Sequence, residues 1–345
     1  MRDGRSRDVG GILEILILGG TIFLGPALVN AALARGHRVT LFHRGLSNPK
    51  MFPDLRHVCG DRRRDLQLLQ DGSWDCVIDT CGWVPDVVDA SASFLQHRAN
   101  LYVFVSTASV YADLSHIGLD ENSPTSQVCY QPGQTPSEDM MGGLKALCER
   151  AVAARFTGRA LIIRAGTLVG RDDPLHRLAY WTNRVEQGGE VLAPGKPDRR
   201  IQLIDVRDLA EWVIRMLEMQ QVGTYNTVSP PGALTMGDII KTCRCVCNLD
   251  ASISWVSDQI LCSQGIRLNA LPFWIPTSMP QYAGLYAMDS RKAIESGLHF
   301  RDLAETIRNT ANLRPGEVVP PLSGLLAPSA EADLLAIHRQ TIGGS

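Results

Sequence analysis

Short apolar runs alternate with stretches of helical periodicity from residue 14 to residue 164. We expect strands at residues 15–18, 39–43, 57–59, 76–80, 101–106 and 161–164. Helices are expected at residues 23–35, where Gly36 supplies the terminating signal, and at residues 139–154. Strands that alternate with helices in this way are typical of a parallel sheet covered on both faces. The pattern therefore predicts an α/β fold built on a doubly wound parallel sheet.

A glycine-rich segment, GGTIFLG at residues 19–25, lies between the first strand and the first helix. Glycine at this point lets the backbone turn tightly and approach a pyrophosphate, which the free N–H groups of the helix N-terminus stabilise. An ordinary tight turn is the alternative interpretation, but the position between strand and helix favours dinucleotide binding in a Rossmann-type fold. The residues expected to bind the cofactor here are Gly19, Gly20, Thr21, Phe23, Leu24 and Gly25.

The ends of the next three strands carry further candidate cofactor-binding residues. A site that prefers NAD usually has Asp or Glu after the second strand, whereas this chain has HRG at residues 43–45. The guanidinium of Arg44 matches a 2′-phosphate, so NADP is favoured over NAD, with a solvated surface arginine as the alternative. Asp61 follows the third strand, where a carboxylate can accept a hydrogen bond from adenine. The residues expected along the pyrophosphate and nicotinamide ribose are Thr80, Cys81 and Gly82.

The alternation loosens after residue 164, where proline-containing loops occur at residues 173–174 and 194–197. A helix is expected from about residue 205 to residue 219, and Thr235 is a plausible N-cap for a second helix that reaches Cys247. Residues 270–280 contain three prolines and exclude a long regular element.

These patterns divide the chain into three regions. We expect a dinucleotide-binding Rossmann core at residues 12–164 and a smaller C-terminal substrate lobe at residues 165–313, interleaved with the last core elements. A C-terminal extension at residues 314–345 follows, with a proline-rich spacer at 315–321 and a terminal helix at 330–340.

Composition and charge exclude several classes of protein. With 45% apolar and 20% charged residues, the 345-residue chain has the composition of a globular protein rather than a disordered or coiled-coil one. A net charge of −2 supplies no overall attraction to nucleic acid or to an anionic membrane. No window approaches the roughly 18 uninterrupted apolar residues of a membrane span.

The N-terminus combines a basic stretch at residues 2–7 with an apolar run at 12–18, as a signal peptide does. Glu14 interrupts the apolar run and no small-residue cleavage site follows, so we expect a frayed tail before the first strand. Without an export signal, the nine cysteines are expected to be reduced thiols in a cytoplasmic protein. On the expected helix only Cys243 and Cys247 share a face, and no metal site is expected.

Five motifs together resemble the NAD(P)-dependent epimerase/dehydratase family, which is the extended and atypical group of short-chain dehydrogenases/reductases. The GGTxFLG form is similar to the bacterial reductase-like members, and chloroplast stem-loop RNA-binding proteins resemble the same branch. The match covers most of residues 14–312. The motifs are GGTIFLG at 19–25, LFHRG at 41–45, VFVSTASVYAD at 103–113, GGLKALCE at 142–149 and QLIDVRDLAEW at 202–212.

The resemblance implies a catalytic Ser or Thr, a Tyr and a Lys, the last two in Tyr-x-x-x-Lys spacing. Thr107 falls at the Ser/Thr position, and Lys145 at the lysine position, where an ammonium can hold the nicotinamide ribose. Met141 stands where the family has tyrosine. A thioether has no exchangeable proton, so water, the substrate or another residue must supply one. The candidate residues are Tyr111, Tyr130, Cys81 and Glu138.

Three departures from the family pattern bear on the substrate and the cofactor. Thr167 stands where nucleotide-sugar enzymes usually carry Asn, and Arg171 stands where Pro is expected. Both weaken a nucleotide-sugar assignment. Ile22 replaces the middle glycine of the fingerprint, which loosens the expected approach to the pyrophosphate. An apolar substrate pocket or ordinary core packing would account for the aromatic residues of the second half, Trp181, Trp255, Phe273, Trp274, Tyr282 and Tyr286.

We therefore expect an NAD(P)-dependent oxidoreductase, and in particular an NADPH-linked reductase that acts on a small organic carbonyl or an activated double bond. Two alternatives stay open: a nucleotide-sugar epimerase or dehydratase, and a catalytically silent protein that binds NADP or RNA. The expected partner is a small-molecule substrate, and a homodimer is compatible with the sequence. The mildly acidic charge balance argues against unaided binding of nucleic acid.

Overall fold

The centre of the molecule is a seven-stranded parallel sheet with the strand order β11-β6-β5-β4-β1-β2-β3. The computed structural model describes residues 11–135, 137–311 and 324–343. The sheet contains β1 (Glu14–Leu18), β2 (Arg38–His43), β3 (Arg56–Cys59), β4 (Trp74–Asp79), β5 (Ala99–Thr107), β6 (Ala160–Ala165) and β11 (Gly223–Thr227). The order reverses between β1 and β4, where open α/β sheets bind ligands. The predicted doubly wound α/β fold is confirmed.

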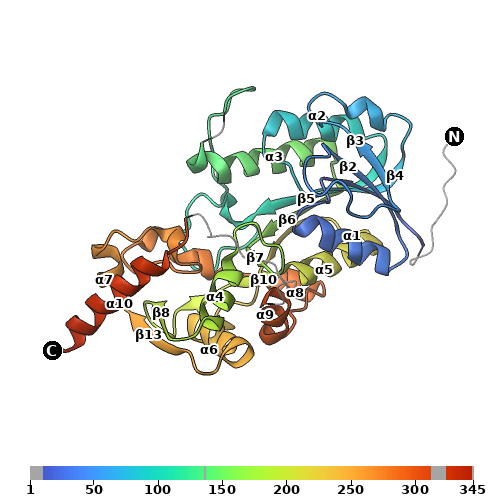
Figure 1. Cartoon of the computed structure of the whole chain (residues 1–345). Helices are drawn as coiled ribbons and strands as arrows, with labels where there is room; N and C mark the ends of the chain where they lie inside the picture. The colour runs from blue at the N-terminus through green and yellow to red at the C-terminus, as the bar shows by residue number, and fades with distance from the viewer. Residues whose placement is uncertain (1–10, 136, 312–323, 344–345) are drawn as a thin grey trace.

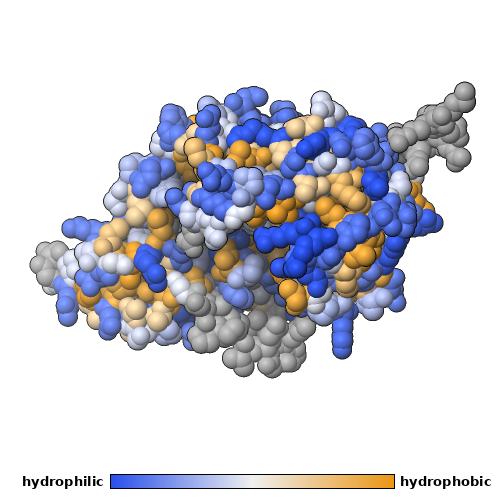
Figure 2. All heavy atoms as spheres, turned by 90° about the horizontal axis from the view of Figure 1, so that it is seen from above, coloured by the Kyte–Doolittle hydropathy of each residue, from blue (hydrophilic) through white to orange (hydrophobic). Residues whose placement is uncertain are grey.

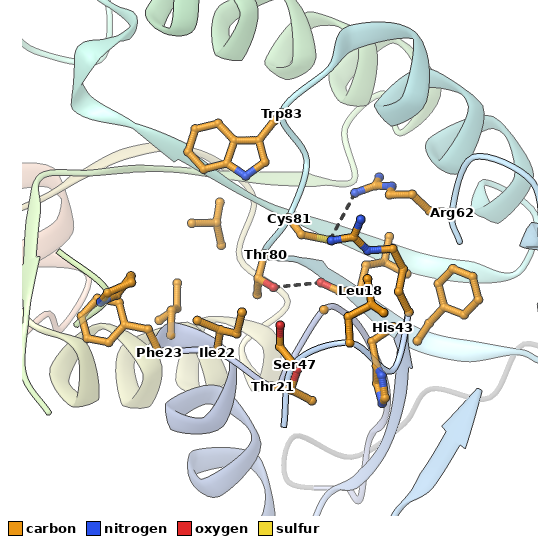
Figure 3. A pocket seen from close by; sticks show the side chains of 18 of the residues that line it. Leu18, Thr21, Ile22, Phe23, His43, Ser47, Arg62, Thr80, Cys81 and Trp83 are labelled. Carbon is orange, nitrogen blue, oxygen red and sulfur yellow. Dashed lines mark hydrogen bonds between the residues drawn. The ribbon is translucent and has the colours of Figure 1, made fainter. Parts of the chain in front are cut away.

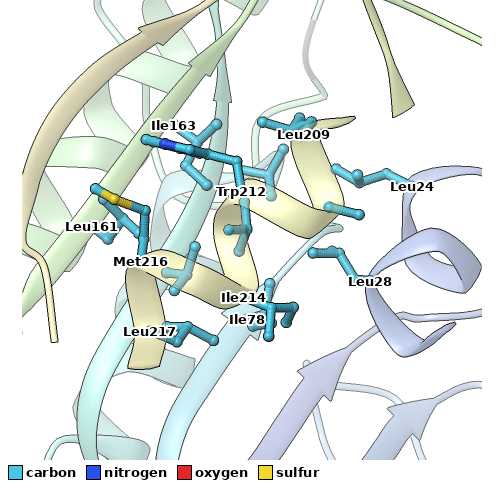
Figure 4. Close-up of a cluster of buried hydrophobic side chains, with 14 of the residues drawn as sticks. Leu24, Leu28, Ile78, Leu161, Ile163, Leu209, Trp212, Ile214, Met216 and Leu217 are labelled. Atoms are coloured by element: carbon cyan, nitrogen blue, oxygen red, sulfur yellow. The ribbon is translucent and has the colours of Figure 1, made fainter. Parts of the chain in front are cut away.

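Helices cover both faces of this sheet (Figure 1). On one face α1 (Leu24–Ala34) contacts α5 (Val206–Glu218), and on the other α2 (Pro85–Leu95) contacts α3 (Met141–Arg155). Figure 4 shows Leu24 and Leu28 of α1 on the side of α5 that carries Leu209 and Ile214, whereas the fully buried Trp212 of α5 extends toward Ile163 of β6. Burial of these apolar side chains, at about 25 cal/mol per Å² removed from water, anchors the segment that follows β1.

The edge strand β11 was not predicted from the sequence. Its residues, GTYNT, include a buried and polar Asn226, which interrupts the apolar signal of a core strand. The amide of Asn226 donates hydrogen bonds to the carbonyl oxygens of Leu119, at 3.1 Å, and Asp289, at 3.0 Å. Because these bonds satisfy the buried amide, a polar residue is accommodated in the strand.

A second core lies in the C-terminal lobe, around the fully buried Trp181. The paired strands β7 with β10 and β8 with β13 are parallel, and β9 with β12 is antiparallel. Thr235 caps α6 through a capping box with Asp238, as its position predicted. The strands of the lobe are β7 (Thr167–Val169), β8 (Glu190–Pro194), β9 (Arg200–Ile201), β10 (Leu203–Asp205), β12 (Leu234–Thr235) and β13 (Ser252–Val256). Its helices are α4 (Arg177–Glu186), α6 (Met236–Cys247), α7 (Asp258–Ser263), α9 (Leu303–Ala311) and α10 (Pro328–Gly343), whereas α8 (Arg291–Glu295) packs against β11 of the central sheet.

The aromatic residues of the second half serve mainly as lobe core. Trp181, Phe273 and Trp274 are buried, whereas Tyr282 is exposed. Residues 268–286 contain only short 3₁₀ turns, in agreement with the three prolines. The 3₁₀ turns of the described residues are η1 (Leu66–Leu69), η2 (Ala108–Val110), η3 (Glu138–Met140), η4 (Leu268–Ala270) and η5 (Pro280–Tyr286).

The terminal helix α10 is joined to the lobe through Glu331. This nearly buried carboxylate accepts hydrogen bonds from Arg184, at 2.6 Å, and from the backbone N–H of Leu192, at 2.9 Å. Leu334 and Leu335 of the same helix enter the lobe core. The expected spacer at residues 315–321 and the basic stretch at residues 2–7 lie outside the described residues.

The described residues contain nine cysteines, all of them free thiols. Cys243 is buried and Cys245 exposed, and burial raises the pKa of the half-buried Cys247 thiol to about 11. Within residues 11–135, 137–311 and 324–343 no group of three metal-ligating side chains is arranged to hold an ion. Over the same residues, no helix has the length and apolar character that crossing a membrane demands. Figure 2 shows hydrophilic and hydrophobic side chains interspersed over one face of the molecule.

Candidate functional site

A cavity of about 670 Å³ opens at the carboxyl ends of the central strands. Its walls come from the turn after β1, from the segments after β2, β3 and β4, from the ends of β5 and β6, and from the loop before α4. The predicted site residues that line it are Gly19, Gly20, Thr21, Phe23, Leu24, Arg44, Asp61, Thr80, Cys81, Thr107 and Lys145. The sheet thus gathers residues from distant segments of the chain at one edge.

The turn after β1 depends on glycine for two separate reasons. Gly19 and Gly20 have φ angles of 99° and 95°, which side chains rarely adopt. A Cβ atom on Gly19 would also lie 2.5 Å from Oγ1 of Thr80, whose hydroxyl donates to the Leu18 carbonyl oxygen at 2.8 Å (Figure 3). The turn is therefore fixed against β4 and leaves the N-terminus of α1 facing the cavity.

Two of the glycines expected to bind the cofactor do not line the cavity. A Cβ atom on Gly25 would lie 2.5 Å from the backbone of Gly20, so this glycine lets α1 pack against its own turn. A Cβ atom on Gly82 would lie 2.6 Å from the Phe104 ring, so that glycine makes room for the sheet. Gly25 and Gly82 therefore affect the cavity indirectly, because they allow the segments that line it to pack closely.

Arginine side chains surround the end of the cavity beside β2 and β3. Arg44 and Arg63 are exposed and line the cavity, and neither guanidinium makes a hydrogen bond or an ion pair within the described part of the chain. Asp61 also lines the cavity and accepts a hydrogen bond from the backbone N–H of Arg63 at 2.9 Å. Unpaired guanidinium groups in a concave site attract anions, and phosphate above all.

A buried ion pair, which the sequence did not predict, supports the floor of the cavity. Arg62 donates to both carboxylate oxygens of the fully buried Asp79, at 2.8 and 2.7 Å. Tyr102 donates to the same carboxylate at 2.8 Å. Burial raises the pKa of Asp79, but the charge and hydrogen bonds of Arg62 and Tyr102 outweigh it, so the pKa is lowered overall. The sequence signal that could have indicated this ion pair is Asp79 itself, a carboxylate at the end of a mostly apolar strand.

Lys145 lies at the opposite end of the cavity, on α3, and only 2% of it is exposed. Its ammonium donates to the carbonyl oxygen of Val105 at 2.7 Å and lies 4.2 and 4.7 Å from the ring centres of Trp83 and Phe104. Burial, the dominant influence, lowers the pKa of Lys145 to about 8. Thr107 lines the same end and accepts a hydrogen bond from the N–H of Ser109 at 3.2 Å.

Apart from Cys81, the remaining residues considered for catalysis are directed elsewhere, do not line the cavity or lie outside the described residues. Met141 and Tyr111 do not line the cavity. The buried phenol of Tyr111 donates to Asn226 at 2.5 Å and accepts from Arg164 at 3.3 Å. Tyr130 donates to Asp86 at 2.7 Å. The side chain of Glu138 lies outside the described residues, whereas Cys81 stands in the cavity wall.

The lobe contributes Asp173 and Arg177, which line the cavity and neutralise each other. Arg177 donates to Asp173 at 3.0 Å and to the carbonyl oxygen of Leu168 at 2.7 Å. Large apolar side chains dominate the remaining wall here, since Ile22 is 53%, Trp83 49% and Leu175 62% exposed. Trp83 faces Ile22 across the cavity (Figure 3). This end is apolar and carries no unpaired guanidinium among the described residues.

The model of the NAD dependent epimerase/dehydratase family matches residues 15–228, which is more than half of the chain. The chain belongs to this family. The resemblance that the motifs indicated is confirmed, and the matched segment includes every residue that the sequence predicted for the site.

Two curated relatives match about two thirds of the chain. The chloroplast stem-loop binding protein of 41 kDa b of Arabidopsis thaliana is 25% identical over 252 residues, which cover 67% of this chain. The chain spans 62% of that protein's length. The epimerase family protein SDR39U1 of Bos taurus is 24% identical over 246 residues, which cover 66% of this chain and 79% of the bovine one.

Solved structures share the fold at low identity. UDP-N-acetylglucosamine 4-epimerase from Bacillus cereus has a TM-score of 0.62 at 18% identity, over 86% of this chain and 97% of its own. Human SDR39U1 with NADPH has a TM-score of 0.58 at 18% identity, over 87% of this chain and 100% of its own. UDP-glucuronic acid 4-epimerase from Bacillus cereus with NAD has a TM-score of 0.61 at 17% identity, over 87% of this chain and 97% of its own.

Proposed function

We propose that this protein is an NADPH-linked reductase that acts on a small, apolar carbonyl compound or activated double bond. The observation that carries the proposal is the division of one cavity into two chemically different ends. Unpaired guanidinium groups stand at the end beside β2 and β3, and Thr107, Lys145 and apolar side chains stand at the other. The glycine turn lies between them.

The residues of the cavity fit a nicotinamide dinucleotide. The turn at residues 19–24 is shaped by glycine where a Cβ atom would collide, so a pyrophosphate can approach the N-terminus of α1. Arg44 and Arg63 would hold a 2′-phosphate, for which NADP supplies the partner and NAD does not. Asp61 would accept a hydrogen bond from adenine, and Lys145 would hold the nicotinamide ribose. The names of two structural neighbours, one with NAD and one with NADPH, support the class of cofactor.

The chemistry follows from the groups at the lobe end. The cofactor supplies a hydride when bound. The hydroxyl of Thr107 donates a hydrogen bond to the substrate oxygen and orients it. The Lys145 ammonium stabilises the negative charge that develops on this oxygen and supplies a proton, for which a pKa of about 8 is suitable near neutral pH. Lys145 thereby takes over work that a tyrosine performs elsewhere in the family.

The lobe end favours an uncharged substrate over a nucleotide sugar. A diphosphate needs cationic partners, but Arg177 is already paired with Asp173. The exposed side chains of Ile22, Trp83 and Leu175 instead offer apolar surface to a substrate. Burying that surface is the main source of affinity for a small organic carbonyl compound.

A second candidate function is binding of NADP(H) without turnover. It is supported by the cavity wall, where the described residues include no tyrosine, and by the phenol of Tyr111, which is held by Asn226. In that case Lys145 and Thr107 would serve binding alone, and the protein would respond to the NADPH pool.

Fluorescence titration with NADPH and NADH, followed by a turnover assay with a panel of aliphatic and aromatic aldehydes and ketones, tests the proposal. We expect tighter binding of NADPH than of NADH and oxidation of NADPH by at least one apolar carbonyl compound. Binding without turnover across the panel would favour the second candidate. If the protein binds neither NADPH nor NADH, both candidate functions are contradicted. If it turns over a UDP-sugar but no carbonyl compound of the panel, the protein is an epimerase rather than a reductase.

A further inference from the structure

A chain of three hydrogen bonds ties the segment after β2 to β3. The backbone N–H of Gly45 donates to Nδ1 of His43 at 3.0 Å. Nε2 of His43 lies 2.8 Å from Nδ1 of His57, and Nε2 of His57 lies 3.0 Å from the carbonyl oxygen of Phe52. His43 is only 8% exposed, so water does not replace these partners easily.

The two ends of this chain determine where every proton lies. Because Gly45 donates, Nδ1 of His43 must accept, and a neutral His43 then carries its proton on Nε2. Because the Phe52 carbonyl accepts, Nε2 of His57 must donate, and Nδ1 of His57 is left to accept from His43. A proton added to either ring would turn an accepting nitrogen into a donor that faces another donor. All three hydrogen bonds therefore coexist only while both imidazoles are neutral.

The segment held in this way carries the proposed phosphate-binding residue. Arg44 lies between His43 and Gly45, and residues 44–47 all line the cavity. At the far side of the segment, Asn48 donates to the carbonyl oxygen of Thr21 at 2.9 Å, which ties it to the glycine turn. The orientation of Arg44 thus depends on the histidine hydrogen bonds on one side and on the Asn48 hydrogen bond on the other. Only the histidine side contains a group that can change its protonation state near neutral pH.

We infer that His43 and His57 are positioning residues for the cofactor selectivity of this site, and that they hold Arg44 in its phosphate-binding position only in their neutral forms. The inference rests on the proposed function, since it concerns the 2′-phosphate of NADPH. His43 lines the cavity and His57 does not, and both act on Arg44 through the backbone of residues 43–45. Acidification then releases Gly45 and lowers the affinity for NADPH more than that for NADH.

Few other charges act on the pair. The neighbouring strand β1 and the glycine turn, residues 15–25, contain no titratable side chain. The charged side chains of the intervening segment and of β3 are exposed, and they are Arg44, Lys50, Asp54 and Arg56. Cys59 is the other titratable neighbour, with its sulfur 3.9 Å from where a Cβ atom on Gly45 would lie. Burial first, and then the charge of His57, lower the pKa of His43.

The direction of the pH effect follows from this lowered pKa. When the segment is released, the pKa of His43 returns to its ordinary value of about 6.5. When the segment is anchored, the pKa of His43 is lower, so this form binds a proton less readily. The anchored form is therefore favoured above pH 6.5 and loses ground as the pH falls below that value. One hydrogen bond of this kind corresponds to about a threefold to tenfold change in affinity.

Nitrogen NMR of the unliganded protein tests the chain directly. At pH 7.5 we expect both imidazoles in the Nε2–H form, with the Gly45 amide protected from hydrogen exchange. On acidification to pH 5.5 that protection should fall together with the protonation of His43. An Nδ1–H form of His43 at pH 7.5, or a Gly45 amide indifferent to pH, would overturn the inference even if NADPH binds tightly.

Affinity measurements test the link to selectivity. In His43→Asn the Asn side chain can accept the Gly45 N–H in an Asx turn and does not titrate. We expect its NADPH affinity to lie within threefold of the parent at pH 7.5 and about threefold to tenfold above the parent at pH 5.5. Comparison at equal pH cancels the titration of the 2′-phosphate itself.

Two further variants complete the experiment. His43→Leu removes the acceptor and should weaken NADPH binding at every pH while changing NADH binding little, and His97→Asn, at an exposed histidine, should match the parent. Superimposable pH profiles of parent and His43→Asn would overturn the inference. If the parent protein binds neither NADPH nor NADH at any pH, the proposed function is contradicted. The NMR experiment would then still show whether the histidine hydrogen bonds exist and depend on pH.

Discussion

Lys145 is a buried cation whose direct contacts are a carbonyl oxygen and two aromatic rings, while the charge of the buried Asp79 only partly offsets the effect of burial on its pKa. Its ammonium meets the Val105 carbonyl oxygen and the rings of Trp83 and Phe104. Burial lowers its pKa to about 8, so the folded state binds fewer protons than the unfolded state between pH 8 and the ordinary value of 10.5. The free energy of unfolding should therefore rise with pH over that window, by roughly 3 kcal/mol at most.

The same titration predicts the pH dependence of turnover. We expect the rate with NADPH to fall as pH rises through about 8, because the neutral amine neither donates a proton nor stabilises negative charge. Lys145→Met should lose turnover but gain stability in urea unfolding, since an apolar side chain suits this position. A rate that stays constant from pH 7 to pH 9 in an active parent would assign the proton to another group.

Arg44 and Arg63 predict selectivity that can be measured without a substrate. Replacement of either by Ala should weaken NADPH binding by about 1.5–3 kcal/mol, the value of a hydrogen bond to a charged group, and NADH binding little. Arg64→Ala is the matched control, because Arg64 is exposed in the same segment but does not line the cavity. Equal losses for the two dinucleotides would mean that these arginines hold the loop rather than the 2′-phosphate.

Among the secondary-structure elements, α1 connects packing to binding. Gly25 lies in its first turn and approaches the backbone of Gly20, so a larger side chain there pushes the helix away from the turn that shapes the cavity. The helix is held from the other side by α5, so it has little freedom to retreat.

Gly25→Val should therefore reduce thermal stability even without ligand. Overpacking of this kind costs about 1–3 kcal/mol, which for a domain of this size lowers the melting temperature by several degrees. Asn30→Val, at an exposed position of the same helix, controls for the helix propensity of valine. If Gly25→Val instead weakens NADPH binding at unchanged stability, the side chain reaches the ligand.

At the scale of the whole molecule, the sequence predicted what depends on local pattern and missed what depends on distant contacts. Six core strands and the glycine turn were predicted, because apolar runs and glycine are local signals. The edge strand β11 was not predicted, because its buried Asn226 is stabilised by hydrogen bonds to residues more than sixty positions away in the sequence. The cavity likewise receives Arg62, Trp83 and Arg177 through the folding of distant segments, which spacing along the chain does not show.

The strand β11 pairs with β6 but is synthesised about sixty residues later, which has a consequence for the growing chain. Until residues 223–227 leave the ribosome, β6 presents an open row of backbone donors and acceptors, the arrangement through which proteins aggregate edge to edge. Residues 166–222, which belong mostly to the lobe and α5, must be made first. We expect a fragment ending at residue 164 to aggregate when it is expressed alone, whereas the full chain stays dispersed. Light scattering distinguishes them, and a monodisperse short fragment would show that synthesis and folding of the core are independent of the lobe.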